Sequence, residues 1–347
     1  MKALVLTAYN KLEYMDMPDP EINPDEVLVE VRACGICGSD VHGLDGSTGR
    51  RIPPLIMGHE ASGVIIGTGS GVTRWQTGDR VTFDSTVYPL DDWHTLQGRY
   101  NLSDNREVLG VSPGTYRRHG AFAQYLAVPQ HILYRIPDNV SFVQAAMVEP
   151  VAVALHALSL SGIQVGESVL VAGAGMIGLC LIQSVAASGA SPVMVADISD
   201  QKLALAREMG ADVTFNPQSG SITAKVAELT SGRGADVAFE AVGISETVGM
   251  AIELVRKGGR VVLVGNLSAK IEFPLQSVVT REINVRGSCA IRGEYESALR
   301  LISNGKICVD PLISAVAPLS EGAEWFSRLY AREPGLNKVI LVPDQVL

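Results

Sequence analysis

The sequence predicts an α/β fold in which a mostly β domain is followed by a doubly wound parallel sheet. Up to about residue 150, short apolar runs alternate with turn residues, and helical periodicity is scarce. From about 150 to 290, six short apolar strands alternate with helical stretches, as in a parallel sheet covered by helices. Beyond about 290 the chain is helical and then forms an apolar strand. We therefore expect this last segment to complete the first domain.

The first domain is expected to span residues 1–150 and 291–347. Its strands are predicted at residues 1–6, 27–31, 61–66, 81–83 and 338–342, and its late helices at 294–303 and 321–330. The turn-rich run at 67–71 separates two of the strands and favours irregular, barrel-like pairing.

The second domain is expected to span residues 151–290. It opens with a helix at 151–158 that is apolar nearly all round and therefore buried. Six strands are predicted at residues 168–172, 192–197, 212–215, 236–240, 260–264 and 282–286. Helices are predicted at 177–188 and at 201–209, where Ser199 is the N-cap and Gly210 the stop.

Composition excludes several classes of protein. The chain is 47% hydrophobic and 19% charged, so a large core is expected. A net charge of −9 without a Lys/Arg-rich run argues against nucleic acid or an anionic membrane as partner. No stretch reaches the roughly 18 apolar residues of a membrane span. Five irregularly spaced cysteines favour a reducing, cytoplasmic compartment.

A glycine-rich turn predicts a dinucleotide site. The strand at 168–172 runs directly into Gly173, which allows a tight turn, and Gly175 lets the backbone approach a pyrophosphate. Gly178 lets the following helix pack closely, and the helix N-terminus faces the phosphates. Asp197 ends the next strand and can accept both ribose hydroxyls, which favours NAD over NADP. The predicted cofactor-binding residues of this domain are Gly173, Gly175, Met176, Ile177, Gly178, Asp197, Val242 and Gly265.

A second group of residues suits a zinc ion. Cys37, His59 and a carboxylate form a borderline-soft donor set, and a catalytic zinc needs three protein ligands and one open position. Glu60 follows His59 directly, so it either binds the metal or stands behind it. Glu149 lies at the predicted domain boundary and is the alternative carboxylate.

The thiols also have simpler interpretations. A buried cysteine is usually a small hydrophobic residue, and Cys34-x-x-Cys37 could be half of a zinc knuckle or a redox dithiol. A knuckle needs a second cysteine pair, but the next cysteine is Cys180 in the other domain. The redox interpretation lacks its usual βαβ context.

Together the motifs carry a family resemblance over essentially the whole chain. Residues 37–42 (CGSDVH), 58–60 (GHE) and 148–150 (VEP), with the glycine turn, resemble the zinc-dependent medium-chain dehydrogenase/reductase family, most of all its polyol branch of sorbitol and iditol dehydrogenases. The resemblance implies a chaperonin-10-like catalytic domain, a Rossmann domain with a six-stranded sheet, and a homodimer or homotetramer joined through the nucleotide domains.

The resemblance also implies roles for individual residues. Cys37 and His59 match catalytic zinc ligands, and Glu60 matches the third ligand of the sorbitol branch. Glu149 falls where alcohol dehydrogenases have a ligand cysteine, and in the polyol branch it acts through the water on the metal.

Three further residues match positions outside the ligand set. Ser39 matches the hydroxyl that takes the substrate proton, and His42 matches the histidine that passes this proton to solvent, with a cofactor ribose hydroxyl between them. Lys338 falls near a basic residue that approaches the pyrophosphate, so it joins the cofactor-binding set.

The chain departs from the family at two places. Many relatives bind a structural zinc through four cysteines, and the matching positions here are Pro89, Asp92, Thr95 and Ser103. We therefore expect one zinc per chain, and expect Tyr88 and Trp93 to hold this lobe by packing. Sorbitol dehydrogenases share an arginine where this chain has Ala290, with Arg292 two residues later, which argues against sorbitol itself.

The sequence thus predicts an NAD-dependent zinc enzyme that oxidises a secondary hydroxyl of a polyol to the ketose, reversibly. Another secondary alcohol, a vicinal diol, a sugar-alcohol phosphate or a threonine-like substrate remain alternatives. A non-catalytic nucleotide-binding protein, or a zinc-free quinone or enone reductase, would not need Cys37, Ser39, His42 and His59 together.

Overall fold

A computed structural model describes residues 1–112 and 118–344, which form two compact units. Unit 1 comprises Met1–Glu149, Tyr295–Ser303 and the residues from Val309 onwards, and unit 2 comprises Pro150–Glu294 and Asn304–Cys308. The predicted assignment of a catalytic and a cofactor domain stays a prediction, and residues 113–117 and 345–347 lie outside the described part.

Unit 1 is built on β-sheets. Its strands are β1 (Lys2–Ala8), β2 (Lys11–Asp16), β3 (Glu26–Gly35), β4 (Leu55–Ile56), β5 (Glu60–Thr68), β6 (Arg80–Phe83), β7 (Thr86–Val87), β8 (Glu107–Val108), β9 (Tyr125–Pro129), β10 (Leu133–Arg135), β17 (Ile313–Pro318) and β18 (Lys338–Val342). Seven form one sheet in the order β10-β6-β5-β3-β18-β17, with β9 also paired to β3. Strands β2-β1-β4 and β7-β8 form smaller sheets.

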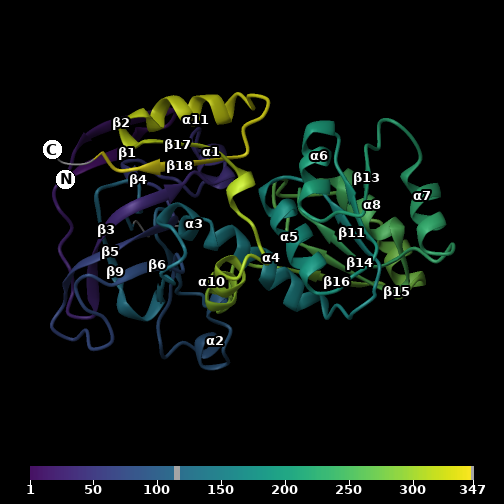
Figure 1. Ribbon diagram of the computed structural model, residues 1–347, viewed down its shortest axis with the longest axis horizontal. Coiled ribbons are helices and arrows are strands. Elements are labelled where there is room, and N and C mark those ends of the chain that lie inside the picture. Colours follow the sequence, from purple (N-terminus) through teal and green to yellow (C-terminus); the bar gives the residue numbers. More distant parts are fainter. Residues whose placement is uncertain (113–117, 345–347) are drawn as a thin grey trace. The chain divides into compact units, whose positions relative to one another are not determined.

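Strand β3 organises unit 1. Its alternating residues Val27, Val29 and Val31 are buried, as expected for a strand with one face on the core. It pairs antiparallel with β5, β9 and β18. The C-terminal strands β17 and β18, yellow in Figure 1, thus belong to the same sheet as the purple strand β3. The tail of the chain therefore pairs with a strand from its first part.

Short helices cover unit 1. They are α1 (Gly38–Gly43), α2 (Trp93–Leu96), α3 (Phe142–Ala146), α10 (Tyr295–Ser303) and α11 (Gly322–Tyr330), with 3-10 turns η1 (Tyr100–Leu102), η2 (Gln130–Ile132), η3 (Asp310–Leu312) and η4 (Leu319–Glu321). In the core, the rings of Phe122 and Phe326 meet edge to face with centroids 5.6 Å apart. Helix α4 (Val148–Ser161) begins in unit 1, so Glu149 lies in its first turn.

Unit 2 contains the predicted parallel sheet. Its six strands are β11 (Val169–Ala172), β12 (Val193–Ala196), β13 (Val213–Phe215), β14 (Ala235–Glu240), β15 (Val255–Leu263) and β16 (Asn284–Gly287). They lie in the order β13-β12-β11-β14-β15-β16 and every pair is parallel. The helices of this unit are α5 (Met176–Ala187), α6 (Asp200–Glu208), α7 (Ile222–Leu229), α8 (Ser245–Leu254) and α9 (Leu275–Thr280). The predicted doubly wound fold is confirmed, and the strand order reverses between β11 and β14.

Two of the predicted strand starts differ from the structure by two residues or more. The last sheet strand was expected from residue 282, but Glu282 has a φ of 51°, so the extended backbone begins at Asn284. Strand β15 was expected from residue 260 and begins at Val255, because its lysine- and glycine-containing first half lacks a clear strand pattern.

The lobe around residues 88–103 is held differently from the expectation. Tyr88 stacks on Tyr100 with ring centroids 4.2 Å apart, in line with the expectation that Tyr88 packs within this lobe. Trp93 meets the ring of His94 edge to face, with centroids 4.8 Å apart, but it is 67% exposed and so contributes little buried area. Instead, Asp92 caps α2 by accepting hydrogen bonds from His94 N and Thr95 N.

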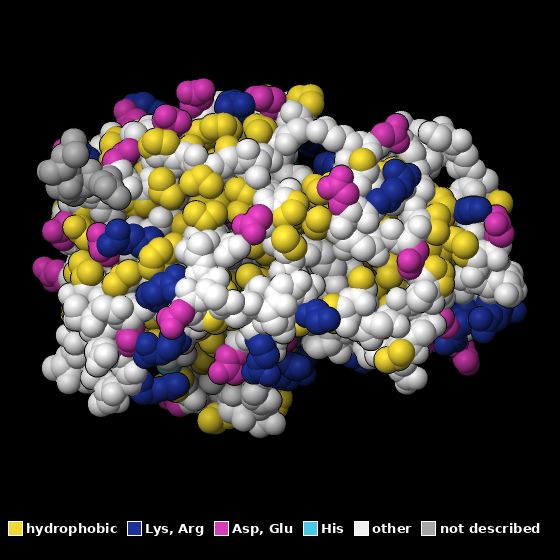
Figure 2. Space-filling model, in the orientation of Figure 1, with side chains coloured by type: hydrophobic (Ala, Val, Ile, Leu, Met, Phe, Trp, Pro, Cys, Tyr) yellow, Lys and Arg dark blue, Asp and Glu magenta, His cyan; other side chains and the backbone are white. Residues whose placement is uncertain are grey.

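The surface agrees with the composition. On the face drawn in Figure 2, basic and acidic side chains are interspersed rather than gathered by sign. Within residues 1–112 and 118–344, no helix has the length and apolar character needed to cross a membrane.

Candidate functional site

Three potential metal donors converge in unit 1. The donor atoms of Cys37, His59 and Glu60, called the donor cluster below, all lie within 4.8 Å of one another. Cys37 is the N-cap of α1, directly after β3, and Glu60 is the first residue of β5. Because Gly35 of β3 pairs with Glu60 of β5, the pairing of these two strands brings the segments together.

A buried charged pair lies behind His59. Asp40 Oδ2 is 3.4 Å from His59 Nδ1, and Asp40 Oδ1 accepts hydrogen bonds from Arg51 Nε (3.0 Å) and Nη2 (2.6 Å). Burial would raise the pKa of Asp40, but His59 and Arg51 lower this pKa well below its usual range. Conversely, burial would lower the pKa of His59, but Asp40 and Cys37 raise it. The ring therefore sits in a strongly negative environment.

Glu60 is fixed by a cation from the far end of the chain. Lys338 Nζ donates to Glu60 Oε2 (2.6 Å) and to Ile36 O (3.0 Å), and both charged side chains are almost fully buried. Burial would lower the pKa of Lys338, but Glu60 raises it. The contacts of Lys338 thus differ from the expectation that it approaches a pyrophosphate, because its ammonium group is committed to the donor cluster.

Glu149 lies next to the donor cluster without belonging to it. It is half-buried in the first turn of α4, and its carboxylate is not among the atoms that converge within 4.8 Å. Burial, with the negative charge of Glu60, raises the pKa of Glu149 to about 7. Of the two carboxylates that the sequence left open, Glu60 is the one that the fold brings to Cys37 and His59.

The two predicted proton-transfer residues lie on α1. Ser39 and His42 are both exposed and are three positions apart, which places them on one side of the helix. Ser39 Oγ donates to Cys37 Sγ at 3.3 Å, so its hydroxyl is next to the donor cluster. Cys34, by contrast, is buried in the core, where burial raises the pKa of its thiol.

The donor cluster fits a zinc ion. Zinc binds thiolate, imidazole and carboxylate, and its ligating histidines are usually backed by a carboxylate. The buried atoms Asp40 Oδ2 and His59 Nδ1 lie 3.4 Å apart and have no hydrogen-bond partner. Their charge interaction leaves the other ring nitrogen, Nε2, available for a metal.

In unit 2, the glycine turn has the expected local geometry. Gly173 follows β11 with a φ of 102°, in the left-handed region that favours glycine. A Cβ on Gly178 would lie 1.9 Å from Gly173 O, so helix α5 packs directly against the turn. Open space surrounds the Cβ position of Gly175, the residue expected to admit a pyrophosphate, at the N-terminus of α5 with Met176 and Ile177 in its first turn.

Asp197 is held against this turn. Its Oδ2 accepts from Ala174 N (2.8 Å) and its Oδ1 accepts from Ser199 N (2.9 Å). Val242 and Gly265, which follow β14 and β15, also meet closely, because a Cβ on Gly265 would lie 2.3 Å from Val242 N. The predicted cofactor residues other than Lys338 therefore gather at the carboxyl ends of neighbouring strands, where dinucleotides bind in such sheets.

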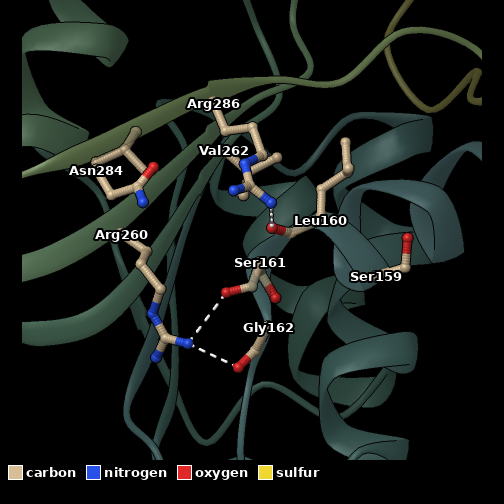
Figure 3. Close-up of a pocket in the computed structure, with 9 residues that line it drawn as sticks. Ser159, Leu160, Ser161, Gly162, Arg260, Val262, Asn284 and Arg286 are labelled. Atoms are coloured by element: carbon tan, nitrogen blue, oxygen red, sulfur yellow. Dashed lines mark hydrogen bonds between the residues drawn. The ribbon is translucent and has the colours of Figure 1, made fainter.

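A separate pocket of unit 2 has a structural explanation. It has a volume of about 220 Å³ and is lined by the end of α4 and by β15 and β16 (Figure 3). Arg260 Nη1 donates to the carbonyls of Ser161 and Gly162, and Arg286 Nη1 donates to Leu160 O. These guanidinium groups satisfy the last carbonyls of α4, as basic side chains at helix C-termini do.

Comparison with family models identifies both parts of the chain. Residues 23–138 match the alcohol dehydrogenase GroES-like domain, and residues 177–304 match the zinc-binding dehydrogenase domain. The chain belongs to the zinc-binding dehydrogenases. The predicted family is thereby confirmed.

Similar proteins include enzymes named for a ketose and for a polyol phosphate. The chain is 35% identical to a D-xylulose reductase A of Aspergillus niger, over 99% of this chain and 97% of that protein. It is 31% identical to the galactitol-1-phosphate dehydrogenase of Escherichia coli, with a TM-score of 0.91, over 99% of this chain and 100% of that one. A dehydrogenase structure from Sinorhizobium meliloti bound to NADP is 33% identical, with a TM-score of 0.90 and 99% coverage of both chains.

The sequence analysis of this zinc-binding dehydrogenase missed the residues behind the donor cluster. Arg51 lies in a loop between α1 and β4, where no periodicity or motif marks it. Asp40 was read only as part of a motif. The one available signal was that an arginine in an apolar, proline-containing segment needs a buried partner.

Proposed function

We propose that this chain is a zinc-dependent, NAD-linked polyol dehydrogenase that converts a secondary hydroxyl to the ketose, reversibly. The observation that carries the proposal is the donor cluster of Cys37, His59 and Glu60 with the Ser39 hydroxyl beside it. Such a set of donors beside a proton acceptor is what metal-assisted alcohol oxidation requires. We also propose that unit 1 is the catalytic domain and unit 2 the cofactor domain.

Cys37, His59 and Glu60 would hold the zinc in this proposal. His59 would bind through Nε2, because Nδ1 faces Asp40. Glu149 would remain beside the metal rather than bind it directly. A bound zinc supplies Lewis acidity toward the substrate hydroxyl, and the nicotinamide supplies the hydride acceptor.

Two side chains of the protein transfer the proton of the substrate hydroxyl to solvent. Ser39 accepts the proton of the substrate hydroxyl and gives up its own, and His42 releases a proton to solvent. The exposed position of His42 on the same side of α1 supports this order. Reversal of the steps returns a proton to the substrate when the ketose is reduced.

NAD is the proposed cofactor. The Asp197 carboxylate is held by two backbone N–H groups in a position to accept ribose hydroxyls, and its charge would repel a 2′-phosphate. Because the similar dehydrogenase from Sinorhizobium meliloti was solved with NADP, the assay must compare NAD with NADP.

A polyol is the proposed substrate class. The relatives named for D-xylulose and for galactitol 1-phosphate support it. Ala290, where sorbitol dehydrogenases carry an arginine, is exposed and has a φ of 51°, so no guanidinium is available at that position. We therefore propose a polyol other than sorbitol.

The assay that tests the function is a panel of pentitols, hexitols, their phosphates, vicinal diols and simple secondary alcohols with NAD and with NADP. We expect reduced cofactor to form fastest with a polyol and NAD, and expect about one zinc per chain by metal analysis. Preference for a simple alcohol would overturn the substrate class. Two zinc ions per chain would overturn the one-zinc assignment.

We further propose a homodimer or homotetramer. Strand β16 is an edge of the six-stranded sheet and most of its residues are exposed, so a second copy can pair there. Light scattering of the purified protein would give the mass, and a monomer would contradict this assignment.

A further inference from the structure

The charged side chain of Arg51 is buried between the carboxylate of Asp40 and the hydroxyl of Ser39. Its side chain is 3% exposed, and it lies in the loop before β4. Burying a guanidinium costs desolvation free energy unless a paired charge and hydrogen bonds compensate for the lost water. The buried position of Arg51 therefore needs a structural or functional explanation. Its hydrogen bonds identify that reason.

The guanidinium divides its donors between Asp40 and Ser39. Nε and Nη2 both donate to Asp40 Oδ1, at 3.0 and 2.6 Å, and Nη2 also donates to Ser39 Oγ at 3.2 Å. The remaining nitrogen, Nη1, donates to the carbonyl of Arg50 at 3.3 Å. The ion pair with Asp40 accounts for the charge, but the bond to Ser39 is additional.

The position of the arginine stem is fixed by a missing side chain. A Cβ on Gly43, the last residue of α1, would lie 2.4 Å from Arg51 Cγ and 3.3 Å from its Cβ. Real atoms do not approach so closely, so any side chain at this position would push the arginine away. The same helix therefore carries Ser39 and makes room for the side chain that binds it.

We propose that Arg51 is a positioning residue that sets the hydrogen-bond direction of the Ser39 hydroxyl. The inference rests on the proposed function, in which Ser39 accepts the substrate proton. A serine hydroxyl has one donor and two acceptor lone pairs, and Arg51 fills one lone pair. One lone pair then stays open to the substrate, and the O–H must point elsewhere, as it does toward Cys37 Sγ.

The hydrogen bond from Arg51 to Ser39 would restrict the proton to transfer from the substrate to Ser39 and away from the arginine. The substrate O–H bond breaks as a new O–H bond forms at Ser39 Oγ, and the original serine proton leaves Oγ for His42, which releases a proton to solvent. A guanidinium has no acceptor site, so that proton cannot enter the Arg51–Asp40 pair. The positive charge also favours electron density on Oγ while the proton is in transit.

The decisive experiment is a double-mutant cycle between Arg51 and Ser39 in the full-length, zinc-loaded protein. Arg51→Lys keeps the charge beside Asp40 but cannot fork to both partners. We expect kcat to fall about tenfold, with the KM for NAD unchanged, when Ser39 is present. In a Ser39→Ala background the same substitution should change kcat less than about twofold. The solvent deuterium isotope effect should rise in Arg51→Lys alone.

Zinc content and zinc affinity, measured by competition with a chelator, separate positioning from metal retention. Both should match the wild type in Arg51→Lys. A loss of zinc that parallels the loss of activity would overturn the proposal, as would an equal loss of kcat in both serine backgrounds. A wild type without polyol activity would instead refute the proposed function.

Gly43→Ala provides a second route if Arg51→Lys does not fold. It displaces the guanidinium while leaving every charge in the chain, so it should also lower kcat only when Ser39 is present. Gly249→Ala is the matched control, because this helical glycine of α8 has open space at its Cβ position. An effect of Gly43→Ala that persists in the Ser39→Ala background would refute the positioning role.

Discussion

At the scale of single residues, glycines make the space in which the donor cluster forms. Gly58 adopts a φ of 95° immediately before His59, and a Cβ there would lie 2.9 Å from Cys34 Sγ. A Cβ on Gly35 would lie 2.3 Å from Glu60 Oε2. The backbone of β3 and β5 can therefore bring the carboxylate close to the other donors only because these side chains are absent.

Gly35→Ala is expected to weaken zinc binding. The added methyl group would push the Glu60 carboxylate off its position, and misplaced ligands or their supports reduce metal affinity by about 10- to 100-fold. Competition with a chromogenic chelator measures the change. Gly67→Ala is the control, because its Cβ would make an ordinary 3.6 Å contact with Leu28 in the same sheet. Equal affinities in Gly35→Ala and wild type would exclude a steric role for this glycine.

At the scale of elements, two glycines in the turn from β11 to α5 serve different purposes. Gly178 allows the helix to approach Gly173 O, whereas Gly175 faces open space. One glycine therefore concerns packing within unit 2, and the other concerns what can approach the N-terminus of α5.

Substitutions at these glycines should have distinct effects. Gly178→Ala should lower Tm and NADH affinity together, because α5 must move away from the turn. Gly175→Ala should leave Tm within about 2 °C of the wild type and weaken NADH binding by about tenfold or more, since only the approach of the cofactor is blocked. Calorimetry and fluorescence titration measure the two quantities. If Gly175→Ala binds NADH normally, the pyrophosphate does not approach at this residue.

A carboxylate joins β11 and β14 at their amino ends and should make unit 2 acid-sensitive. Asp236 accepts from Ser168 Oγ (2.7 Å) and from Arg256 Nε (2.6 Å). Burial would raise the pKa of Asp236, but these hydrogen bonds lower it to about 2. A lowered pKa stabilises the folded state above the unfolded pKa of about 3.9, and this stabilisation is lost as pH falls toward 2.

Asp236→Asn should therefore lower Tm at pH 7, and the difference in Tm from the wild type should become smaller at acidic pH. We expect a contribution of about 1–2 kcal/mol above pH 5, roughly halved near pH 3. Differential scanning fluorimetry between pH 7 and 3 measures the gap between variant and wild type. The exposed Asp138→Asn is the control. A gap that is constant with pH would show that the carboxylate does not titrate with folding.

At the scale of the whole molecule, one buried ion pair connects distant parts of the chain. Lys338 opens the last described strand and binds Glu60 and Ile36 near the donor cluster. Removal of one partner of a buried pair typically costs about 3–5 kcal/mol, because the other charge is left uncompensated. A bound zinc would supply a replacement positive charge beside Glu60.

Lys338→Met should therefore depend on zinc for its stability more than the wild type does. We expect the Tm of this variant to rise more on zinc addition to chelator-treated protein than the Tm of the wild type. Lys338→Arg retains the charge and is the control. An identical zinc-induced shift in all three proteins would mean that Lys338 and zinc do not share Glu60.

Sequence reasoning reached the parts of this architecture that depend on local pattern. Alternating strands and helices predicted the parallel sheet, and the spacing of Cys37, Ser39 and His59 marked residues that the fold brings together. The partners of Arg51 and Lys338 could not be predicted in this way, because a buried ion pair leaves no periodic signal along the chain. Lys338 and Glu60 are separated by 278 positions.

The insertion of β18 between β3 and β17 has a consequence for biosynthesis. The Cys34–Gly35 end of β3, which leads to the metal ligands, pairs on one side with Ile340 and Leu341. A ribosome that adds 5–20 residues per second makes these partners only about 15 to 60 s after β3. The contiguous sheet of unit 2 is synthesised in that interval. Until β18 is made, the end of β3 that carries Cys34 lacks one of its strand partners, so we expect the Cys34 thiol, which is buried in the folded chain, to be open to oxidation during synthesis.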